Sequence, residues 1–530
     1  MSDESAGKPP VVILREESSV TSGTAVQEKL IAATRVFADL LRPTFGPRGL
    51  DKMLYKTDGT TAVTNDGAKI IAELMVKHPA AKMLVAMAET QENECGDGVT
   101  GTLLFCSELL IEANRLMDKG LHPLVISSGY EKAKTIALDA IQNISTQIKI
   151  DDHDTLCEIS STALTGKGSE TSTNTLSKLV VSTLQAVTRT EEDGTIRCEA
   201  EDVTMHKIGS GTIDDSHLVR GIIFRRRILL DSLPSLIENA KVATIHGNIA
   251  PRKQIRNAEI EIEEIEQLDA FIESEESTRD QLTKILLASG ANVFLCTGEV
   301  DKGILHRLMR KDCFVAGELD ERELKNTSAV TGSRIVELLT DISSEDIGHA
   351  GRMTAERHTP SEKVEDIITL EECNTPNVVT CAIGGANDLA VEEAIRAIHD
   401  SLRSTSIAIR DGRVLHGGGA THMACALAIR EAAEKEPGRE RLAMEAYARA
   451  LEIIPASLAQ NAGADALDQI LELRAAHRSK SSAVGITESG KVGLTGARIA
   501  AKSLESSIYA ATETCASMLR IDQVISARGD

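Results

Sequence analysis

The spacing of apolar residues predicts a chain with helical ends. Apolar residues recur at intervals of three and four, which is the period of an α-helix, along both ends of the sequence. The predicted helical segments there are 24–41, 68–76, 79–93, 99–118, 389–402, 440–461 and 498–519. Both ends of the chain are therefore expected to be mainly helical.

The middle of the chain alternates between strand and helix patterns. Short apolar runs that predict buried strands occupy 221–224, 241–245 and 291–296. Residues 258–262 alternate between apolar and charged side chains, which predicts an exposed strand, and 264–288 follow with a helical pattern. The simplest architecture inserts this α/β middle into one discontinuous helical domain.

Composition and charge narrow the class of protein. The 58 Lys and Arg residues against 80 Asp and Glu give a net charge of −22, which argues against charge-driven binding to nucleic acid. The ten cysteines form no C-x-x-C pair, so neither a zinc site nor a disulfide framework is indicated. The sequence has no run of about 18 apolar residues, which predicts no membrane span. Residues 1–10 are polar and unlike a secretory signal, so we expect a cytoplasmic protein.

Two glycines and one carboxylate lie between two predicted helices, in the loop 96–102 (GDGVTGT). Gly98 lets the backbone approach a ligand without a Cβ in the way. The following helix offers free N–H groups and a positive dipole end, which suit a phosphate. Asp97 supplies the oxygen ligand that Mg²⁺ prefers. The same short motif also fits a simpler alternative, a turn in which Asp97 caps the second helix.

Further glycine-bearing loops and short motifs occur along nearly the whole chain. They are 44–53 (TFGPRGLDKM), 65–68 (NDGA), 122–123 (HP), 164–167 (LTGK), 417–420 (GGGA), 472–477 (ELRAAH) and 519–522 (LRID). Together with 96–98, and in this order, these motifs make the sequence resemble a group II chaperonin subunit of the thermosome or TRiC/CCT kind.

The resemblance implies a multidomain fold with α and α/β parts. A mostly helical, discontinuous equatorial domain would comprise 1–150 and 404–530 and would bind ATP. A small α/β intermediate domain would comprise 151–219 and 370–403. The α/β apical domain, 220–369, would bind substrate proteins.

The resemblance also implies partners and a function. A helical protrusion of the apical domain, at about 248–284, would act as a built-in lid. Double rings of about sixteen subunits are the form of the family, so sister subunits and non-native client proteins are the implied partners, with no nucleic acid and no membrane. The implied function is an ATP-dependent chaperone in which ATP hydrolysis drives closure of the lid.

An ATP pocket with Mg²⁺ as cofactor follows from the same resemblance. Asp97 would bind the metal ion, and Lys167 would sense the γ-phosphate. The residues that would contact the nucleotide are Thr44, Phe45, Gly46, Pro47, Gly67, Gly98, Val99, Thr100, Gly101, Lys167, Gly417 and Gly418.

Two carboxylates would act as catalytic residues on the attacking water. Asp66 would orient the water from the equatorial domain, and Asp400 would arrive from the intermediate domain on closure, because phosphoryl transfer depends mainly on positioning and charge. Glu392 and Glu393 are alternatives to Asp400. We prefer Asp400 because its spacing to Gly417 matches that of the family.

Three positions depart from the pattern of the family. Val99 and Lys69 stand where threonine is usual, and Ile499 falls where an acidic residue is usual. These departures leave open a second function, a structural or regulatory ring subunit with weak or no ATP turnover. A third possibility is a Walker-type nucleotide site at 496–503, but Ala501 replaces a glycine of that motif and the segment is predicted to be helical.

Overall fold

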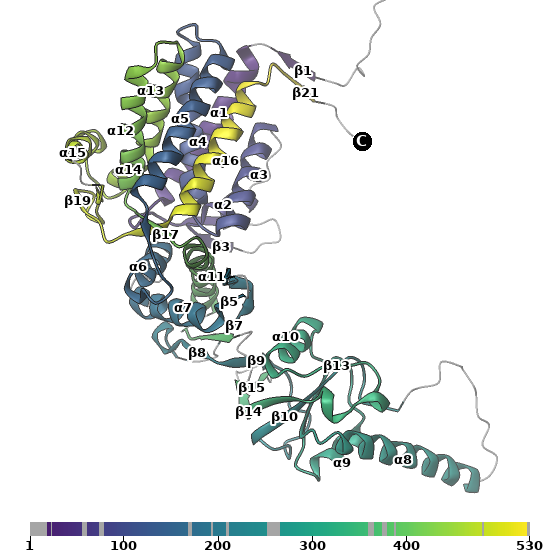
Figure 1. The fold of residues 1–530 in the computed structure, drawn as a ribbon. Helices are drawn as coiled ribbons and strands as arrows, with labels where there is room; N and C mark the ends of the chain where they lie inside the picture. The colour runs from purple at the N-terminus through teal and green to yellow at the C-terminus, as the bar shows by residue number, and fades with distance from the viewer. Residues whose placement is uncertain are drawn as a thin grey trace, which may run out of the picture. The chain divides into compact units, whose positions relative to one another are not determined.

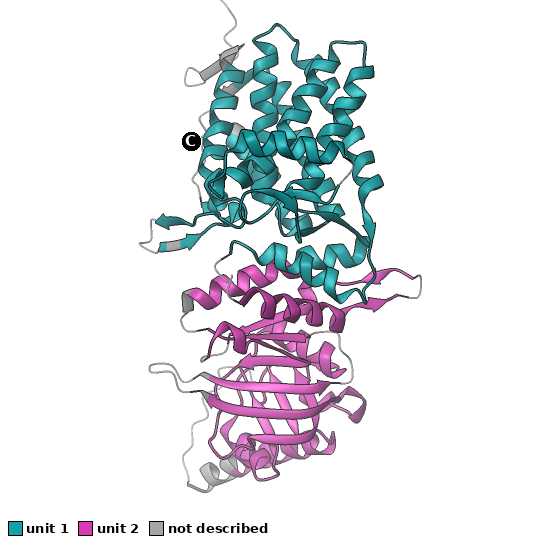
Figure 2. Ribbon diagram, turned by 90° about the vertical axis from the view of Figure 1, so that its left-hand side faces the viewer, with its two compact units in different colours: residues 1–170, 403–530 teal, residues 171–402 magenta. Residues whose placement is uncertain are grey.

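The structure is a computed structural model that divides into two compact units. It describes residues 19–22, 24–55, 61–73, 79–167, 172–191, 194–207, 211–251, 265–358, 365–373, 379–385, 388–479 and 482–526. The first unit consists of residues 1–170 and 403–530, and the second of residues 171–402 (Figure 2). Both ends of the chain therefore form one helical unit, and the α/β unit is inserted between them in the sequence, which confirms the predicted fold class. The finer division into three domains stays a prediction.

The first unit is built mainly of helices that lie side by side (Figure 1). They are α1 (Thr24–Leu41), α2 (Gly67–Glu73), α3 (Pro79–Cys95), α4 (Val99–Met117), α5 (Pro123–Ile144), α6 (His153–Leu164), α12 (Ala420–Lys435), α13 (Glu440–Leu451), α14 (Ile453–Asn461), α15 (Ala466–Arg478) and α16 (Ala501–Leu519), with a short 3₁₀ turn η1 (Arg42–Thr44) after α1. The helical character predicted for both ends of the chain is confirmed, although some boundaries differ, and residues 74–76 of the predicted helix 68–76 lie outside the described residues.

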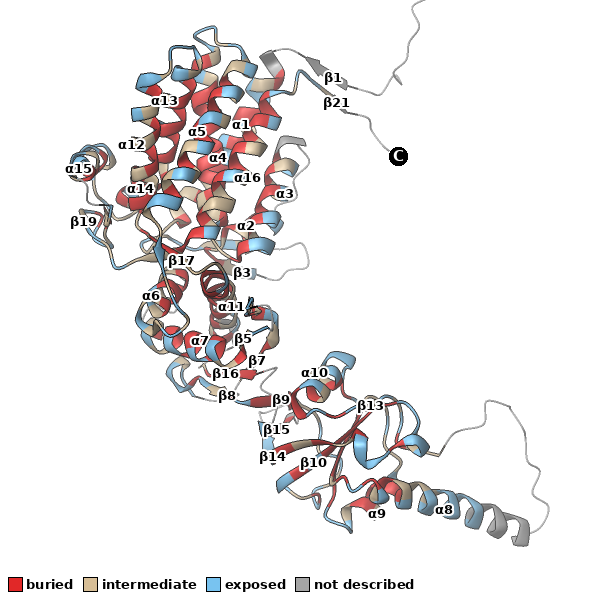
Figure 3. Cartoon of the chain, viewed as in Figure 1, coloured by how far each residue is buried: buried red, intermediate tan, exposed pale blue. Residues whose placement is uncertain are grey.

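Helix α4 lies at the centre of this unit, where it packs against α1, α3, α13 and α16. It is apolar on nearly all sides, as expected of a helix surrounded by others, and its buried faces are red in Figure 3. The ring of Tyr447 meets Phe105 and Tyr130 edge-on, with centroids 5.4 and 5.5 Å apart. The buried Tyr130 hydroxyl donates a hydrogen bond to the carbonyl of Leu109, so its polar end is satisfied.

Short antiparallel strands complete the first unit. They are β1 (Ser19–Ser22) paired with β21 (Gln523–Ser526), β2 (Lys52–Tyr55) with β3 (Thr61–Thr64), β18 (Val484–Ile486) with β19 (Val492–Leu494), and β17 (Arg413–His416) between β20 (Arg498–Ala500) and β4 (Thr146–Gln147). The pairs β1–β21 and β4–β17 join segments from the two ends of the chain.

The second unit contains two larger sheets. The seven-stranded sheet has the order β12 (Phe314–Ala316), β11 (Val293–Cys296), β10 (Leu236–Ile245), β14 (Gly348–His358), β15 (Glu365–Cys373) and β9 (Gly221–Arg225), with β13 (Ile335–Val336) also paired to β10. The three-stranded sheet has the order β7 (Val203–Lys207), β16 (Val379–Ile383) and β8 (His217–Val219). A small hairpin joins β5 (Arg189–Thr190) to β6 (Ile196–Arg197).

The helices of the second unit lie around these sheets (Figure 1). They are α7 (Thr173–Val187), α8 (Ile265–Ala288), α9 (Lys302–Met309), α10 (Glu321–Thr331) and α11 (Asp388–Asp411), with 3₁₀ turns η3 (Ala200–Asp202), η4 (Ile213–Asp215), η5 (Leu339–Asp341) and η6 (Ser344–Asp346). Helix α11 continues into the first unit at Arg403. The exposed strand predicted at 258–262 lies outside the described residues, as does part of the predicted protrusion.

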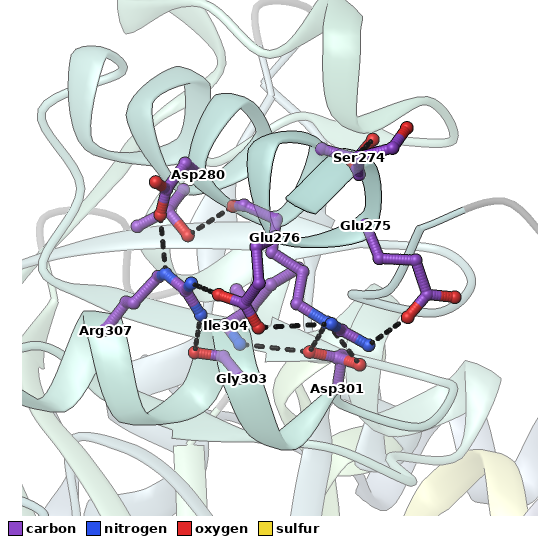
Figure 4. A network of polar contacts seen from close by, with 11 residues as sticks. Ser274, Glu275, Glu276, Asp280, Asp301, Gly303, Ile304 and Arg307 are labelled. Atoms are coloured by element: carbon purple, nitrogen blue, oxygen red, sulfur yellow. Dashed lines mark hydrogen bonds and ion pairs between the residues drawn. The ribbon is translucent and has the colours of Figure 1, made fainter. Parts of the chain in front are cut away.

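Ion pairs join α8 to α9 (Figure 4). Arg279 of α8 lies 3.2 Å from Asp301, which caps α9 by accepting a hydrogen bond from the Ile304 N–H. Arg307 of α9 lies 2.7 Å from Asp280 and also pairs with Glu276, both of α8. These contacts fix the C-terminal half of α8 to the rest of the unit.

Some predicted boundaries were wrong. The helix predicted over 440–461 is two helices that meet at Glu452, and Pro455 lies in the first turn of the second, where proline is tolerated. The helix predicted from Arg498 begins at Ala501, because residues 498–500 pair with β17 as a strand.

Other errors concern strands and a helix end. Helix α11 extends to Asp411, beyond the predicted end at residue 402. The sequence prediction missed β14 and β15, because a run such as 348–358 (GHAGRMTAERH) has few of the β-branched residues that mark strands. These two long strands pair with each other and with β10 and β9, so tertiary pairing rather than local preference holds them.

Candidate functional site

The loop 96–98 turns the chain sharply into α4. Gly96 and Gly98 both have positive φ, of 64° and 86°, and Gly98 is the residue before the first turn of the helix. No side chain in the described part of the chain caps that turn. The alternative in which Asp97 caps the helix is therefore wrong. The first N–H groups of α4 remain available to an anion, and the Asp97 side chain is 38% exposed beside them.

Two buried or partly buried side chains hold this loop in place. Gln91 of α3 donates hydrogen bonds to the carbonyls of Asp97 and Ser503, at 3.2 and 3.3 Å. The stem of Arg403 fills the space beside Gly96 so closely that a Cβ at Gly96 would clash with it. Neither residue was predicted from the sequence, since neither lies in a glycine motif.

The turn that carries Asp66 packs on the first turn of α4. A Cβ at Gly67 would clash with Thr100 Oγ1, so only glycine lets the two segments approach this closely. Asp66 Oδ1 accepts a hydrogen bond from the Ala68 N–H at 3.0 Å. This bond fixes the direction of the Asp66 carboxylate at the start of α2.

The loop 44–47 reaches the same helix from another side. The Phe45 ring contacts Gly101, with 3.5 Å between a Cβ at Gly101 and Phe45 Cε2. A Cβ at Gly166 would lie 2.9 Å from the Gly46 carbonyl oxygen, so the loop that carries Lys167 packs directly on the loop 44–47. Lys167 Nζ lies 3.8 Å from Asp97 Oδ1. The structure thus brings together four loops that are separate in sequence.

The triple glycine is held by a different set of contacts. The Gly417 N–H donates to the Ala497 carbonyl at 2.8 Å, and the Ile486 N–H donates to the Gly418 carbonyl at 2.8 Å. Gly419 precedes α12 with a positive φ of 77°, and a Cβ there would lie 2.6 Å from Pro455 Cβ. Through α14, the triple glycine belongs to the same packed assembly as the loop 44–47.

Asp400 lies on α11 in the second unit and is 5% exposed. The alternative Glu393 forms an ion pair with Arg396 on the same helix, and Glu392 is exposed. Asp400 is thus the buried carboxylate of the three. Its role on the attacking water stays a prediction.

The comparisons with known proteins decide the family. A model of the TCP-1/cpn60 chaperonin family matches residues 37–529. The chain belongs to the TCP-1/cpn60 chaperonin family. The thermosome subunit of Methanopyrus kandleri is 38% identical to this chaperonin over 528 residues, which cover 98% of the chain and 95% of the relative. The thermosome subunit beta of Archaeoglobus fulgidus is 36% identical over 524 residues, with the same shares covered. These relatives identify it as a group II chaperonin.

The positions at which this chaperonin departs from the pattern of its family lie in different surroundings. Val99 is 4% exposed and belongs to the hydrophobic core, so its side chain packs inward. Lys69 is partly buried on α2. Ile499 lies in β20 opposite Leu415. Because residues 498–500 of the Walker-like segment form a strand, that segment cannot form a phosphate loop before a helix, and this alternative is wrong.

Two general predictions concern cysteines and membranes. All ten cysteines of the chaperonin are free thiols. Burial raises the pKa of the Cys106 and Cys425 thiols to about 12. Among the described residues, no helix is both long and apolar enough to cross a membrane.

Proposed function

We propose that this chaperonin binds ATP with Mg²⁺ at the start of α4 and hydrolyses it. The observation that carries the proposal is the pairing of Lys167 with Asp97 beside an uncapped helix N-terminus. A partly exposed carboxylate, a nearby lysine and free N–H groups are the donor set that a metal–phosphate group requires. Glycines at 46 and 67 let the loops that carry Thr44 and Asp66 pack directly on Leu458 and on Thr100, so that both loops lie close to the start of α4.

Each residue of the proposed site has a task. The N–H groups of Gly98 to Gly101 would bind phosphate oxygens, and Lys167 would attract the terminal phosphate as a point charge. Asp97 would hold the magnesium ion, which supplies neutralising charge to the phosphates. Asp66, whose carboxylate is fixed by the Ala68 N–H, would orient the water that attacks the terminal phosphate.

Hydrolysis would also require the second carboxylate, Asp400. We propose that Asp400 reaches the water only when the subunit closes, which would make turnover conditional on a conformational change. Hydrolysis would in turn drive closure of the lid at 248–284. This order of events would couple ATP use to enclosure of a client protein.

The remaining part of the proposal concerns partners and location. Non-native proteins would bind the second unit, where Leu229, Leu236 and Leu338 are exposed. Sister subunits would complete a double ring of about sixteen in the cytoplasm. Support for assembly comes from β2, where Met53 and Tyr55 are 73% and 78% exposed, since large exposed apolar side chains that lie together mark contact surfaces.

Purified assemblies would test the proposal through Mg²⁺-dependent ATP turnover. Asp66→Ala, Asp97→Ala and Asp400→Ala should each reduce turnover by at least about a hundredfold, the scale of removing a positioned acid or base. A client protein that refolds with ATP and not without it would test the chaperone function. Wild-type turnover no higher than that of these variants would contradict the proposal and favour a structural or regulatory ring subunit.

A further inference from the structure

One short helix, α14, contacts two of the glycine loops and the first turn of α4. A Cβ at Gly46 would clash with Leu458 of α14. A Cβ at Gly419 would lie 2.6 Å from Pro455, and one at Gly101 would lie 3.7 Å from Ile454 Cδ1. Because Gly46 and Gly419 are glycines, the backbone at these two positions lies directly on a side chain of α14, and Ile454 lies beside the first turn of α4.

The last residue of α14, Asn461, makes a more specific contact. Its Nδ2 donates hydrogen bonds to the carbonyl of Arg42 at 2.7 Å and to the carbonyl of Phe45 at 2.8 Å. Both amide protons are thus used, and the two carbonyls lie on either side of Pro43 and Thr44. The asparagine thus holds η1, which leads into the loop 44–47, together with Phe45 of the loop itself.

The other hydrogen bonds of this loop are internal or local. The Leu50 N–H donates to the Pro43 carbonyl and the Gly49 N–H to the Gly46 carbonyl, at 2.8 and 2.9 Å. Thr44 Oγ1 donates to the carbonyl of Leu41 at 2.7 Å. These bonds fix the shape of the loop, whereas the Asn461 bonds fix its place on the helical unit.

We propose that Asn461 is a positioning residue for nucleotide binding, acting through the loop 44–47 and so through the face that Phe45 presents to Gly101. The inference rests on the proposed ATP site. Asn461 belongs to none of the loops that would touch nucleotide. Its loss should loosen the loop that closes over the ligand while leaving Asp66 and Asp97 in place, so binding should weaken more than turnover at saturation.

Isosteric variants of neighbouring residues test this. Asn461→Asp removes both donors and sets a carboxylate against two carbonyls, and Gln460→Glu makes the same amide-to-carboxylate change at an exposed position of the same helix. In assembled wild-type and variant protein, ATP turnover and the binding of a non-hydrolysable ATP analogue are measured. Asn461→Asp should raise KM and Kd at least about fivefold, as expected from the loss of one or two hydrogen bonds, with kcat changed less than about twofold. Gln460→Glu should match the wild type.

A pH series separates positioning from general damage to the fold. A carboxyl group beside two carbonyls becomes a donor again when protonated, so the KM of Asn461→Asp should fall toward the wild-type value as the pH is lowered. Asn461→Ala cannot regain a donor, so its KM should be raised at every pH. If Asn461→Asp does not assemble, the KM of Asn461→Ala alone tests the role of Asn461. Equal KM values for wild type, Asn461→Ala and Gln460→Glu would overturn the inference. Wild-type protein that does not bind the analogue at all would instead overturn the proposed ATP site.

Discussion

Lys167 Nζ lies 3.8 Å from Asp97 Oδ1, although Lys167 follows α6 and Asp97 precedes α4. The distance is too long for a hydrogen bond, so the two groups interact as charges. Lys167 is 15% exposed and Asp97 is 38% exposed, so the surrounding protein screens the pair less than water would. The relationship places one fixed positive charge beside the carboxylate at the head of the central helix.

Replacing Asp97 should affect the magnesium ion of the proposed site, whereas replacing Lys167 should affect the transferred phosphate. Asp97→Asn should raise the Mg²⁺ concentration for half-maximal turnover at least about tenfold, because an amide is a poorer ligand for a hard cation than a carboxylate. Lys167→Met should lower turnover at saturating Mg²⁺ by about tenfold or more, because a positive charge near the transferred phosphate is lost. Steady-state ATPase assays over a Mg²⁺ series would measure both effects.

A control for the lost positive charge is Lys119→Met, in the exposed turn after α4. This variant removes the same charge from the same unit, away from the loop 96–98, and should leave turnover unchanged. If Lys119→Met and Lys167→Met lowered turnover equally, the effect would be one of net charge, and the local role of Lys167 would be contradicted.

The backbone at Gly98 gives a second prediction. Gly98 has a φ of 86°, and a Cβ there has room, with Gln91 Nε2 3.5 Å away. Gly98→Ala should therefore cost only the left-handed strain, about 1 kcal/mol of unfolding free energy. It should nevertheless lower nucleotide affinity, because the added methyl group lies beside Gln91 Nε2, which holds the loop 96–98 through the Asp97 carbonyl. Thermal unfolding and analogue binding would be measured on the same protein.

Gly120 provides a matched comparison for this variant. Its φ is 85°, and a Cβ there would meet nothing within 4 Å. Gly120→Ala should carry the same strain and the same small loss of stability, with nucleotide binding unchanged. Equal losses of binding in the two variants would show that strain, and not the site, controls affinity.

The sequence was sufficient for the parts of the site that are local motifs. The loop 96–98 and the triple glycine were found because glycines at positive φ must be encoded where they occur, whatever the rest of the chain does. Helices such as α16 were found because they bury a regular face. In these segments local pattern and tertiary packing agree, which is the condition for reading structure from sequence.

Supports of the site were missed because they depend on contacts between distant segments. Asn461 gains meaning only through the carbonyls of Arg42 and Phe45, and Gln91 through the carbonyls of Asp97 and Ser503. An asparagine at the end of a helix is common, so the sequence alone does not mark Asn461 as a support of the site. The break at Glu452 did have a local signal, because Pro455 has no N–H to donate to the Leu451 carbonyl in a continuous helix.

The ion pairs between α8 and α9 support a third prediction. Arg307→Met removes the pairs with Glu276 and Asp280. Exposed pairs contribute little individually, about 0.2–1 kcal/mol, so global stability should change by less than about 1 kcal/mol. Local opening should increase, seen as several-fold faster amide hydrogen exchange in residues 273–288. High salt should speed exchange in the wild type and reduce the difference, because it screens the pairs.

Lys284→Met is the control on the same helix. Lys284 is exposed, and it forms no ion pair with any residue that the structure describes. Its replacement should leave exchange in 273–288 unchanged at low salt. Unchanged exchange in Arg307→Met as well would mean that the apolar contacts under α8, such as that of Leu286, hold the helix without help from charge.

A fourth prediction concerns Glu452, where α13 meets α14. Burial alone would raise the pKa of this carboxyl, but hydrogen bonds from Arg474 and Arg430 outweigh it and hold the pKa below its ordinary value of 4.5. A carboxyl with a lowered pKa in the folded state stabilises the fold fully above its ordinary pKa. This stabilisation is lost as the pH falls from about 4.5 through the lowered value. At pH 7, Glu452→Gln should reduce the unfolding free energy by about 2 kcal/mol, the scale of charged hydrogen bonds.

The decisive measurement is the difference in thermal midpoint between wild type and Glu452→Gln as a function of pH. The difference should be constant from pH 8 to about 5 and should shrink toward zero at lower pH, because the protonated wild type also lacks the negative charge. Glu434→Gln, at an exposed position of α12, should give no such pH-dependent difference. A difference that persisted unchanged to pH 3 would show that Glu452 acts through shape and not through charge.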